Sequence, residues 1–194
     1  IRLNNKKKYF SVSNNFQNNI YNILSALAVI SIYKNIFKLN ENIFLNFKIP
    51  GGRGDHSVVK INNKKINLID QSYNSNPLSL KSAIKNFDKV KSKNSNKYLL
   101  IGDMLELGSH SKKLHKSIAP IINQTKIDKV FVKGKMASII FANISKAKKG
   151  KILLNNSQII ELIRKDLNNN DYLMIKASLA TGFNDIVKDL KGLH

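Results

Sequence analysis

The sequence contains no cysteine, no tryptophan and only three prolines among its 194 residues. Without cysteine, the chain can form neither a disulfide framework nor a thiolate metal site. No apolar run has the length of a membrane span, because polar residues at Asn22, Ser25 and Ser31 interrupt the most apolar segment, residues 20–33. We therefore expect no membrane insertion, and a cytoplasmic protein.

Acidic residues are scarce as well: 12 Asp and Glu stand against 33 Lys and Arg, which gives a formal net charge of +21. Such a balance suggests nucleic acid or an anionic membrane as a partner. The excess is nearly all Lys, however, and it runs along the whole chain, often beside Asn as in residues 5–8 and 62–65. Lys, Asn and Ile are also what an AT-rich genome encodes. Because Arg clusters and interleaved aromatic residues are missing, we expect a solvated surface and no nucleic-acid partner.

The strongest turn signal is Pro50-Gly51-Gly52-Arg53-Gly54, and it divides the chain in two. We expect residues 1–50 to be the tail of one domain, residues 51–54 a linker and residues 55–194 a second domain. The length suits one ordinary core plus part of another, and the first residue is Ile rather than Met. We therefore interpret the chain as a piece of a longer protein.

The two parts differ in their patterns. Before the turn signal, the sequence predicts a strand over residues 9–12, a helix over about 16–37 and an apolar segment over 43–49. After it, strands are expected over 57–61, 65–69, 98–101, 129–132, 152–154 and 172–175, and helices over 79–90, 111–123, 135–144, 157–167 and 184–190. This alternation predicts an α/β fold, a Rossmann-like doubly wound and mostly parallel sheet.

Three further details follow from single residues in this second part. An Asn62-Asn63 turn is expected between the first two strands. Ser79 is expected to cap the first helix, and Pro120 to kink or shorten the second.

Polar side chains gather in three loops that follow predicted strands. These are residues 70–77 (DQSYNSNP), 102–108 (GDMLELG) and 176–178 (KAS). Because ligands of parallel α/β sheets bind beyond the carboxyl ends of the strands, we expect the three loops to converge on one edge. Plainer interpretations also hold at this point, since Asx-rich turns often serve only as helix caps and a single Lys is usually solvated.

Other signals of chemistry are missing from the sequence. It has neither a GxxxxGK[ST] phosphate loop nor a GxGxxG motif. His56, His110 and His194 lack the spacing of a metal site, and His115 is interpreted as a helix-packing residue rather than a catalyst. Composition and spacing alone therefore predict an α/β domain with a polar ligand edge.

Taken in order, the loops resemble the Mur ligases, which build the peptidoglycan stem peptide by ATP-dependent amide formation, and among them the type that adds D-alanyl-D-alanine. Residues 70–77 match a DDSYNANP-like turn, residues 102–108 with Ser111, Leu114 and His115 match a GDMxELG loop followed by SxxLH, and residues 176–178 match a KGS motif. Residues 18–29 (NNIYNILSALAV) are similar to an HNxxNxLAAxA helix, and Gly52-Arg53 to the Gly-Arg that ends the family's central domain.

The resemblance implies a role for particular residues. Contacts to the nucleotide would come from Asn22, Arg53, Asp70, Gln71, Tyr73, Asn74 and Asn76, with Arg53 near the phosphates and Asn22 near the adenine. Contacts to the incoming dipeptide would come from Asp103, Glu106, Lys176 and Ser178. A guanidinium fork suits phosphate oxygens, and Lys176 with Ser178 would hold a carboxylate by charge and hydrogen bond.

The resemblance also implies a reaction and its partners. ATP would phosphorylate the carboxylate of a UDP-N-acetylmuramoyl-tripeptide, and the amine of D-alanyl-D-alanine would attack the acyl phosphate. Mg²⁺ would be bound mainly by the central domain, whose phosphate loop is not in these residues. We therefore expect no catalytic residue and no metal ligand in this chain, no ligation by the chain alone, and a monomer.

Three positions depart from the family pattern. Gln71 replaces the second acid of the turn, Ala177 the middle Gly of KGS, and Asn18 the His of the central helix. These departures put the nucleotide contacts of the turn and the close backbone approach at Ala177 in question.

Two alternatives stay open. A basic nucleic-acid-binding module would account for the charge and would bind any duplex in a salt-sensitive way. Another amide ligase of the same superfamily would share the fold and act on a different amino acid.

Overall fold

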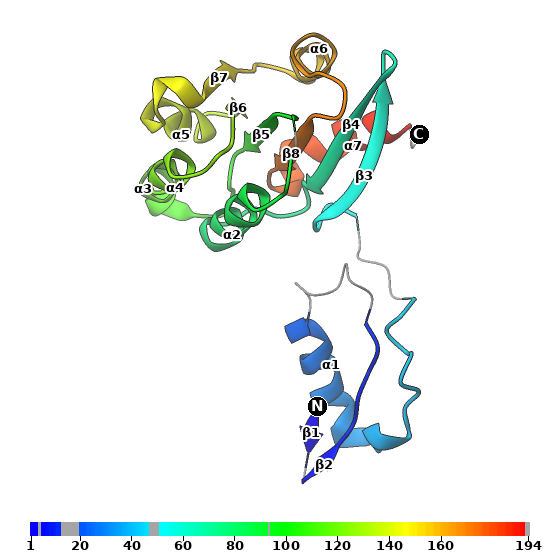
Figure 1. Cartoon of the computed structure of the whole chain (residues 1–194). Coiled ribbons are helices and arrows are strands. Elements are labelled where there is room, and N and C mark those ends of the chain that lie inside the picture. The colour runs from blue at the N-terminus through cyan, green and yellow to red at the C-terminus, as the bar shows by residue number, and fades with distance from the viewer. Residues whose placement is uncertain (4, 13–19, 47–50, 93, 193–194) are drawn as a thin grey trace. The chain divides into compact units, whose positions relative to one another are not determined.

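The computed structural model of the chain describes residues 1–3, 5–12, 20–46, 51–92 and 94–192. Its residues form two compact units, Ile1–Ile49 and Pro50–His194 (Figure 1). The expectations for Asn18, Pro50 and His194, for the start of the helix at residue 16 and for residues 47–49 lie outside the described residues.

The first unit is built around helix α1, Ile20–Tyr33. Its other elements are strands β1 (Arg2–Leu3) and β2 (Lys6–Lys7), which pair antiparallel, and the 3-10 helix η2 (Ile36–Lys38). The strand expected over residues 9–12 is wrong, because the pairing uses residues nearer the start of the chain. Of that segment, Val12 makes a single parallel bridge to Phe44.

Helix α1 buries only a narrow apolar stripe. Ile23 and Leu27 pack with Phe10, Val12, Leu39 and Phe44. The remaining apolar side chains of the helix are largely exposed, including Tyr21 at 79%, Ile32 at 75% and Tyr33 at 80%. A helix that is apolar nearly all round is normally buried on more than one side. Within the described residues of this unit, most of that surface has no cover.

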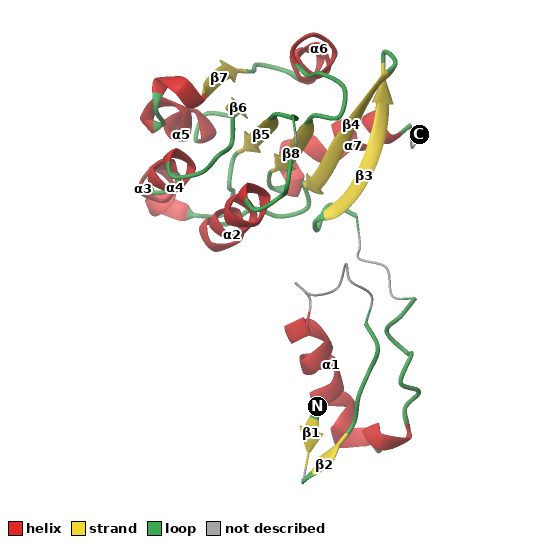
Figure 2. Cartoon of the chain, viewed as in Figure 1, coloured by secondary structure: helices red, strands yellow, loops and turns green. Residues whose placement is uncertain are grey.

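The second unit is a six-stranded sheet with helices on both faces (Figure 2). The strands are β3 (Asp55–Ile61), β4 (Lys64–Gln71), β5 (Lys97–Gly102), β6 (Lys129–Lys133), β7 (Lys149–Ile152) and β8 (Tyr172–Lys176). Their order is β3-β4-β8-β5-β6-β7, and every pair is parallel except β3 with β4. The predicted doubly wound, mostly parallel sheet is confirmed. The last strand in the chain, β8, lies in the middle of it.

The helices of this unit follow the strands in alternation. They are α2 (Pro77–Asp88), α3 (Ser111–Lys116), α4 (Ala119–Asn123), α5 (Ala137–Asn143), α6 (Asn156–Asp166) and α7 (Phe183–Lys191), with 3-10 turns η3 (Gly108–His110), η4 (Lys146–Lys148) and η5 (Leu179–Thr181). One sheet face packs on α2, α4 and α5, and the other on α6 and α7. Successive strand residues, such as Leu99 and Leu100, enter opposite clusters, so the central strands are apolar on both faces.

Several element boundaries differ from those expected. Asn76, not Ser79, caps α2; its side chain accepts from the Ser79 N–H, while the Ser79 hydroxyl accepts from the Asn76 N–H. Pro77 is the first helical residue, where its missing N–H costs nothing. Strand β7 runs over Lys149–Ile152 rather than 152–154, since a strand at the sheet edge tolerates polar residues.

Other local expectations are confirmed. The helix expected over 111–123 is divided into α3 and α4, and Pro120 lies in the first turn of α4. Asn62 and Asn63 have φ angles of +46° and +62° between β3 and β4, the conformation of a tight hairpin turn.

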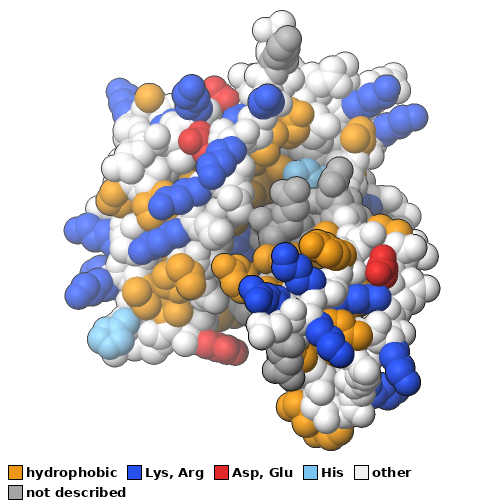
Figure 3. Space-filling view, turned by 60° about the horizontal axis from the view of Figure 1, so that its bottom comes forward, with side chains coloured by type: hydrophobic (Ala, Val, Ile, Leu, Met, Phe, Trp, Pro, Cys, Tyr) orange, Lys and Arg blue, Asp and Glu red, His pale blue; other side chains and the backbone are white. Residues whose placement is uncertain are grey.

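Figure 3 shows the charged side chains of one face of the molecule. On the face shown in Figure 3, Lys and Arg are scattered among polar and hydrophobic side chains, and acidic groups are few. Among the described helices, none combines the length and the apolar character that crossing a bilayer requires.

Gly102, at the end of β5, offers a test of the packing on one side of the sheet. A Cβ there would lie 2.6 Å from Cε2 of Phe183 and 2.7 Å from Cβ of Ala177, both fully buried. Gly102→Ala is therefore expected to lower the free energy of unfolding by about 1–3 kcal/mol. Urea denaturation followed by far-UV circular dichroism measures the change.

Gly51→Ala is the matched control, because a Cβ at Gly51 meets no atom within 4 Å. It is expected to change the free energy by less than about 0.5 kcal/mol. Equal stabilities of the two variants would contradict the close contact at Gly102.

Candidate functional site

The loop that follows β8 joins the other two polar loops. The Ser178 hydroxyl accepts a hydrogen bond from the Leu105 N–H at 3.1 Å and donates to the Ser75 carbonyl at 3.3 Å. The Lys176 ammonium donates to the carbonyl of Asn74. Residues 70–77, 102–108 and 176–178 therefore meet at one edge of the sheet, as their positions after parallel strands predict.

Lys176 is buried, with 2% of its surface exposed. Burial disfavours its charged form and lowers the pKa of the ammonium to about 8. The ammonium contacts the backbone of the turn, so a direct contact with a substrate carboxylate would require the turn at Asn74 to move. Ser178 is also buried, and its hydroxyl is engaged on both sides.

The loop over residues 102–108 is bonded to the helix that follows it. Met104 is buried, and its N–H donates to Nε2 of His115 at 3.0 Å. Nδ1 of His115 lies 2.8 Å from the carbonyl oxygen of Ser111; since that oxygen only accepts, Nδ1 carries the proton. His115 is fully buried, which agrees with its interpretation as a packing residue.

The two acids of this loop differ in their surroundings. A carboxylate oxygen of Asp103 accepts from the Ala137 N–H at 2.7 Å, at the start of α5. A Cβ on Gly134 would lie 2.2 Å from the same oxygen, so a glycine is required beside it. Glu106 is exposed and has a φ of +62°, a conformation that few non-glycine residues adopt. Of the two, Glu106 is presented to solvent.

In the turn over residues 70–77, some side chains are exposed to solvent, and others are buried or bonded within the protein. Tyr73 and Asn74 are exposed, whereas Ser72 and Ser75 are buried. Asn76 is exposed but caps α2. The Ser75 hydroxyl is buried without a hydrogen-bond partner among the described residues.

The linker over residues 51–54 lies against this turn. The Tyr73 N–H donates to the Gly52 carbonyl at 3.1 Å, and the Gly54 N–H to the Asp70 carbonyl at 2.7 Å. The Arg53 guanidinium carbon lies 4.3 Å from the centre of the Tyr73 ring. Gly52 has a φ of +78°, and a Cβ there would lie 2.9 Å from the Tyr73 backbone nitrogen. The linker can approach the turn only because position 52 is glycine.

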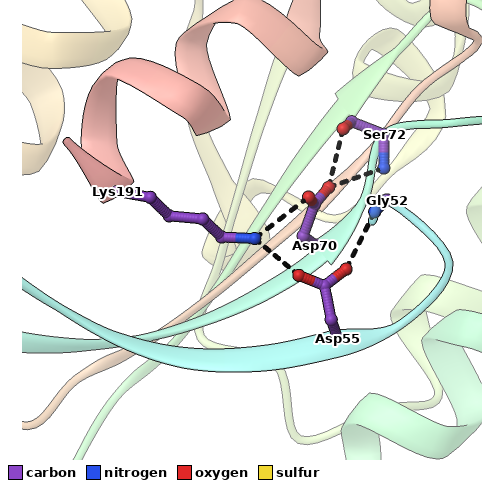
Figure 4. Close-up of polar contacts among 5 residues, drawn as sticks. All are labelled: Gly52, Asp55, Asp70, Ser72 and Lys191. Atoms are coloured by element: carbon purple, nitrogen blue, oxygen red, sulfur yellow. Dashed lines mark hydrogen bonds and ion pairs between the residues drawn. The ribbon is translucent and has the colours of Figure 1, made fainter. Parts of the chain in front are cut away.

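An ion cluster lies beneath both segments (Figure 4). Lys191 Nζ, from the last turn of α7, is 2.5 Å from Asp55 Oδ2 and 3.4 Å from Asp70 Oδ2. Burial opposes the charge of Lys191, but the two carboxylates outweigh it and raise the pKa of the ammonium above its ordinary value. Asp70, expected as a nucleotide contact, is thus buried and engaged in this cluster.

The remaining expected positions lie as follows. Asn22 is exposed on α1, which belongs to the first unit. Gln71 ends β4, and its side-chain amide borders Gly54. The Ala177 methyl is buried in the apolar cluster beside Phe183, not in the polar loops.

Among the described residues, no three His, Asp or Glu side chains are grouped so that they could hold a metal ion. Two concavities, of about 510 and 360 Å³, lie along β3 with the end of α7 and along β7 with α6. Neither of these two is lined by the three loops.

Sequence reasoning missed three residues of this edge: Asp55, Ser72 and Lys191. A signal for Asp55 was present, because the hairpin turn at Asn62-Asn63 pairs it with Asp70 across the strands. For Lys191, one Lys among many in a basic chain, the sequence contains no such signal.

Comparisons with known proteins give the relatives of this chain. The family model described as "Mur ligase, glutamate ligase domain" matches residues 57–179, more than half of the chain. The chain is 30% identical over 128 residues to the UDP-N-acetylmuramoyl-tripeptide--D-alanyl-D-alanine ligase of Bacillus subtilis, covering 64% of this chain and 28% of that protein. It is also 32% identical over 174 residues to the enzyme of the same name from Buchnera aphidicola subsp. Acyrthosiphon pisum. This match covers 89% of this chain and 36% of that protein.

Among solved structures, the MurF ligase of Thermotoga maritima in complex with ADP has the same fold, with a TM-score of 0.70 at 20% identity. The match covers 91% of this chain and 38% of that one. The matches thus span only 28% to 38% of the length of these proteins.

The buried ammonium of Lys176 predicts a pH dependence of stability. Its pKa is about 8 when folded and 10.5 in the ordinary state, so between these values the unfolded chain binds more protons. The free energy of unfolding should therefore rise with pH across this window relative to Lys176→Met, by up to about 3 kcal/mol. Below about pH 8 the cost of the buried charge is fully present, and the variant has its greatest relative stability.

Urea denaturation of both proteins at about pH 7, 9 and 10 measures this difference. Lys60→Met is the control, because Lys60 is exposed on β3 and its replacement should produce no pH-dependent difference. A constant difference between wild type and Lys176→Met would show that Lys176 is not desolvated.

Proposed function

The chain belongs to the Mur ligase family, and from this premise we propose that it is the C-terminal domain, with the tail of the central ATP-binding domain, of a ligase that joins D-alanyl-D-alanine to a UDP-N-acetylmuramoyl-tripeptide. The curated relatives that it matches carry that activity in their names. The observation that carries the proposal is the meeting of the three loops through Ser178 and Lys176, in a domain of this family.

The first unit fits the proposed tail of a larger domain. Tyr21, Ile32 and Tyr33 expose apolar surface that further residues of a nucleotide-binding domain would cover. Residues 51–54 would then be the linker between the two domains, and residues 55–194 the C-terminal domain.

On the nucleotide side, Arg53 is the residue best presented to ATP. It is exposed, and a guanidinium over an aromatic ring keeps N–H donors at its edge for phosphate oxygens. Tyr73 and Asn74 lie beside it on the exposed part of the turn, with Gln71 and Asn76 at its two ends. Asp70 supports this side from beneath, and Asn22 would contribute from the other domain.

On the acceptor side, Asp103 and Glu106 would meet the dipeptide. The exposed Glu106 carboxylate suits its ammonium group. Lys176 and Ser178 hold the turn and the loop in register, and they would reach a carboxylate once the turn at Asn74 moves. The three loops would thus present the amine to the acyl phosphate, mainly by positioning.

The proposed reaction depends on groups outside this chain. ATP would phosphorylate the tripeptide carboxylate, and the dipeptide amine would displace the phosphate. Among the described residues, no three His, Asp or Glu side chains are grouped as a metal site, and Mg²⁺ would be bound mainly by the central domain. The reaction would take place in the cytoplasm as part of cell-wall synthesis, and thus of cell shape and division, without nucleic acid, by a monomer.

Sequencing the gene upstream of Ile1 is the first test of the proposal. We expect an in-frame GTxGKT-type phosphate loop. The protein expressed with those residues should form the amide only with ATP, the UDP-linked tripeptide and D-alanyl-D-alanine together, measured as phosphate release and product mass. The 194 residues alone should release none.

The alternatives give other results in the same experiments. If a start codon precedes Ile1 and no phosphate loop is encoded, the ligase proposal fails for this chain. Amide formation with a single amino acid in place of the dipeptide would identify another ligase of the superfamily. Salt-sensitive binding to any duplex would favour the basic binding module.

The proposed role of Arg53 predicts a kinetic effect. In the longer protein, Arg53→Ala should raise the KM for ATP about 10-fold or more, the loss of at least one charge-assisted hydrogen bond to phosphate. Initial rates at varied ATP measure it. Lys60→Ala, which removes an exposed charge from β3, should leave the KM for ATP unchanged. Equal values for both variants would exclude a phosphate contact by Arg53.

A further inference from the structure

Two carboxylates face each other at the start of the β3–β4 hairpin. Asp55 and Asp70 are directly opposite in the antiparallel register. Like charges in such a pair destabilise a sheet. Asp70 is 4% exposed, so water does little to screen the pair. A cation between the two groups relieves this repulsion.

Lys191 is that cation, and it comes from the far end of the chain. It is within 2.5 Å of Asp55 and 3.4 Å of Asp70, with its own side chain 15% exposed. Lys191 is in the last turn of α7, and the αL residue Gly192 ends the helix directly after it. The position of the ammonium is thus set by the packing of α7 on the sheet.

Each carboxylate uses one oxygen for Lys191 and the other for a segment of the proposed nucleotide site (Figure 4). Asp55 Oδ1 accepts from the Gly52 N–H of the linker at 2.8 Å. Asp70 Oδ1 accepts from the N–H and the hydroxyl of Ser72 in the turn, at 3.0 and 2.6 Å. One lysine therefore orients two acids, and the two acids hold the two segments that carry Arg53 and Tyr73.

We propose that Lys191 is a positioning residue that holds the linker and the polar turn together, so that Arg53 is kept over Tyr73 and directed at the phosphates of ATP. The effect on ATP rests on the proposed function; the effect on the linker does not. In this role Lys191 would contact no substrate itself. It acts through Asp55 and Asp70, and without it the repulsion between them would separate β3, and the linker that precedes it, from the turn.

Hydrogen exchange of the 194-residue chain tests the first part of the proposal. In Lys191→Met, the backbone N–H groups of Gly52 and Tyr73 should exchange about 10-fold faster or more, because their hydrogen bonds depend on the cluster. Amide NMR resolves them individually. The amide of Leu100, in the centre of the sheet, should keep its rate and so report that the fold is intact.

Two variants serve as controls. Lys188→Met removes a neighbouring, largely exposed charge from the same helix and should leave all these rates unchanged. Lys191→Arg keeps the charge and should return the Gly52 rate to within about threefold of wild type. If Lys191→Met does not fold, Asp55→Asn with Lys191→Met removes the facing charge and is compared with Asp55→Asn alone. Because the repulsion is absent in both, Tyr73 should exchange at the same rate in the two proteins, and faster exchange in the double variant would contradict a role of Lys191 through the Asp55–Asp70 pair.

Kinetics of the longer protein test the second part. Lys191→Met should raise the KM for ATP about fivefold or more with kcat within about twofold, whereas Lys188→Met should match wild type. Unchanged exchange at Gly52 and Tyr73 would overturn the proposal. Faster exchange with an unchanged KM would overturn its ATP part. If the wild-type protein itself forms no amide, the proposed function fails, and the exchange result still decides the role of Lys191.

Discussion

Hydrogen-bonded between β4 and β5, strand β8 brings the last polar loop of the sequence between the first two. The register pairs Lys176 with Gln71 on one side and with Ile101 on the other. Ser178 can therefore bond to both neighbouring loops at once. A strand at the sheet edge would reach only one of them. The geometry of the whole candidate site depends on this central position.

The same edge concentrates groups whose burial is costly. Lys176, Ser178 and Asp70 are nearly inaccessible, and a buried polar group destabilises a fold unless it is paired. Lys176 and Ser178 are paired with the backbone of a neighbouring loop, and Asp70 is paired with Ser72 of its own loop and with Lys191 of α7. Their interactions cross between segments far apart in the sequence, so they order the loops relative to one another. Burying these polar groups lowers the stability of the fold, but their pairing fixes the arrangement of the exposed residues Arg53, Tyr73, Asn74 and Glu106.

Sequence patterns predicted most of the fold and part of the site. The alternation of strands and helices was sufficient for the parallel sheet, because buried strands and amphipathic helices have distinct periods. The convergence of the three loops followed from the direction of parallel strands. The patterns failed where local signals compete. Asn76 and Ser79 both suit a helix cap. The apolar residues 152–154 resemble a strand, but the strand in the structure is Lys149–Ile152.

The sequence by itself determined the fold class, the family resemblance and the identity of the polar loops, because each of these depends on residues close together along the chain. Only the tertiary structure decided which of those polar residues face solvent and which hold the loops in place. Asp70 and Lys176 were expected at a ligand, yet both are buried, Asp70 paired with Lys191 and Lys176 bonded to the carbonyl of Asn74. Lys191 lies 121 residues from Asp70, and no local pattern relates two such positions. Their pairing arises only when α7 packs beside the β3–β4 hairpin.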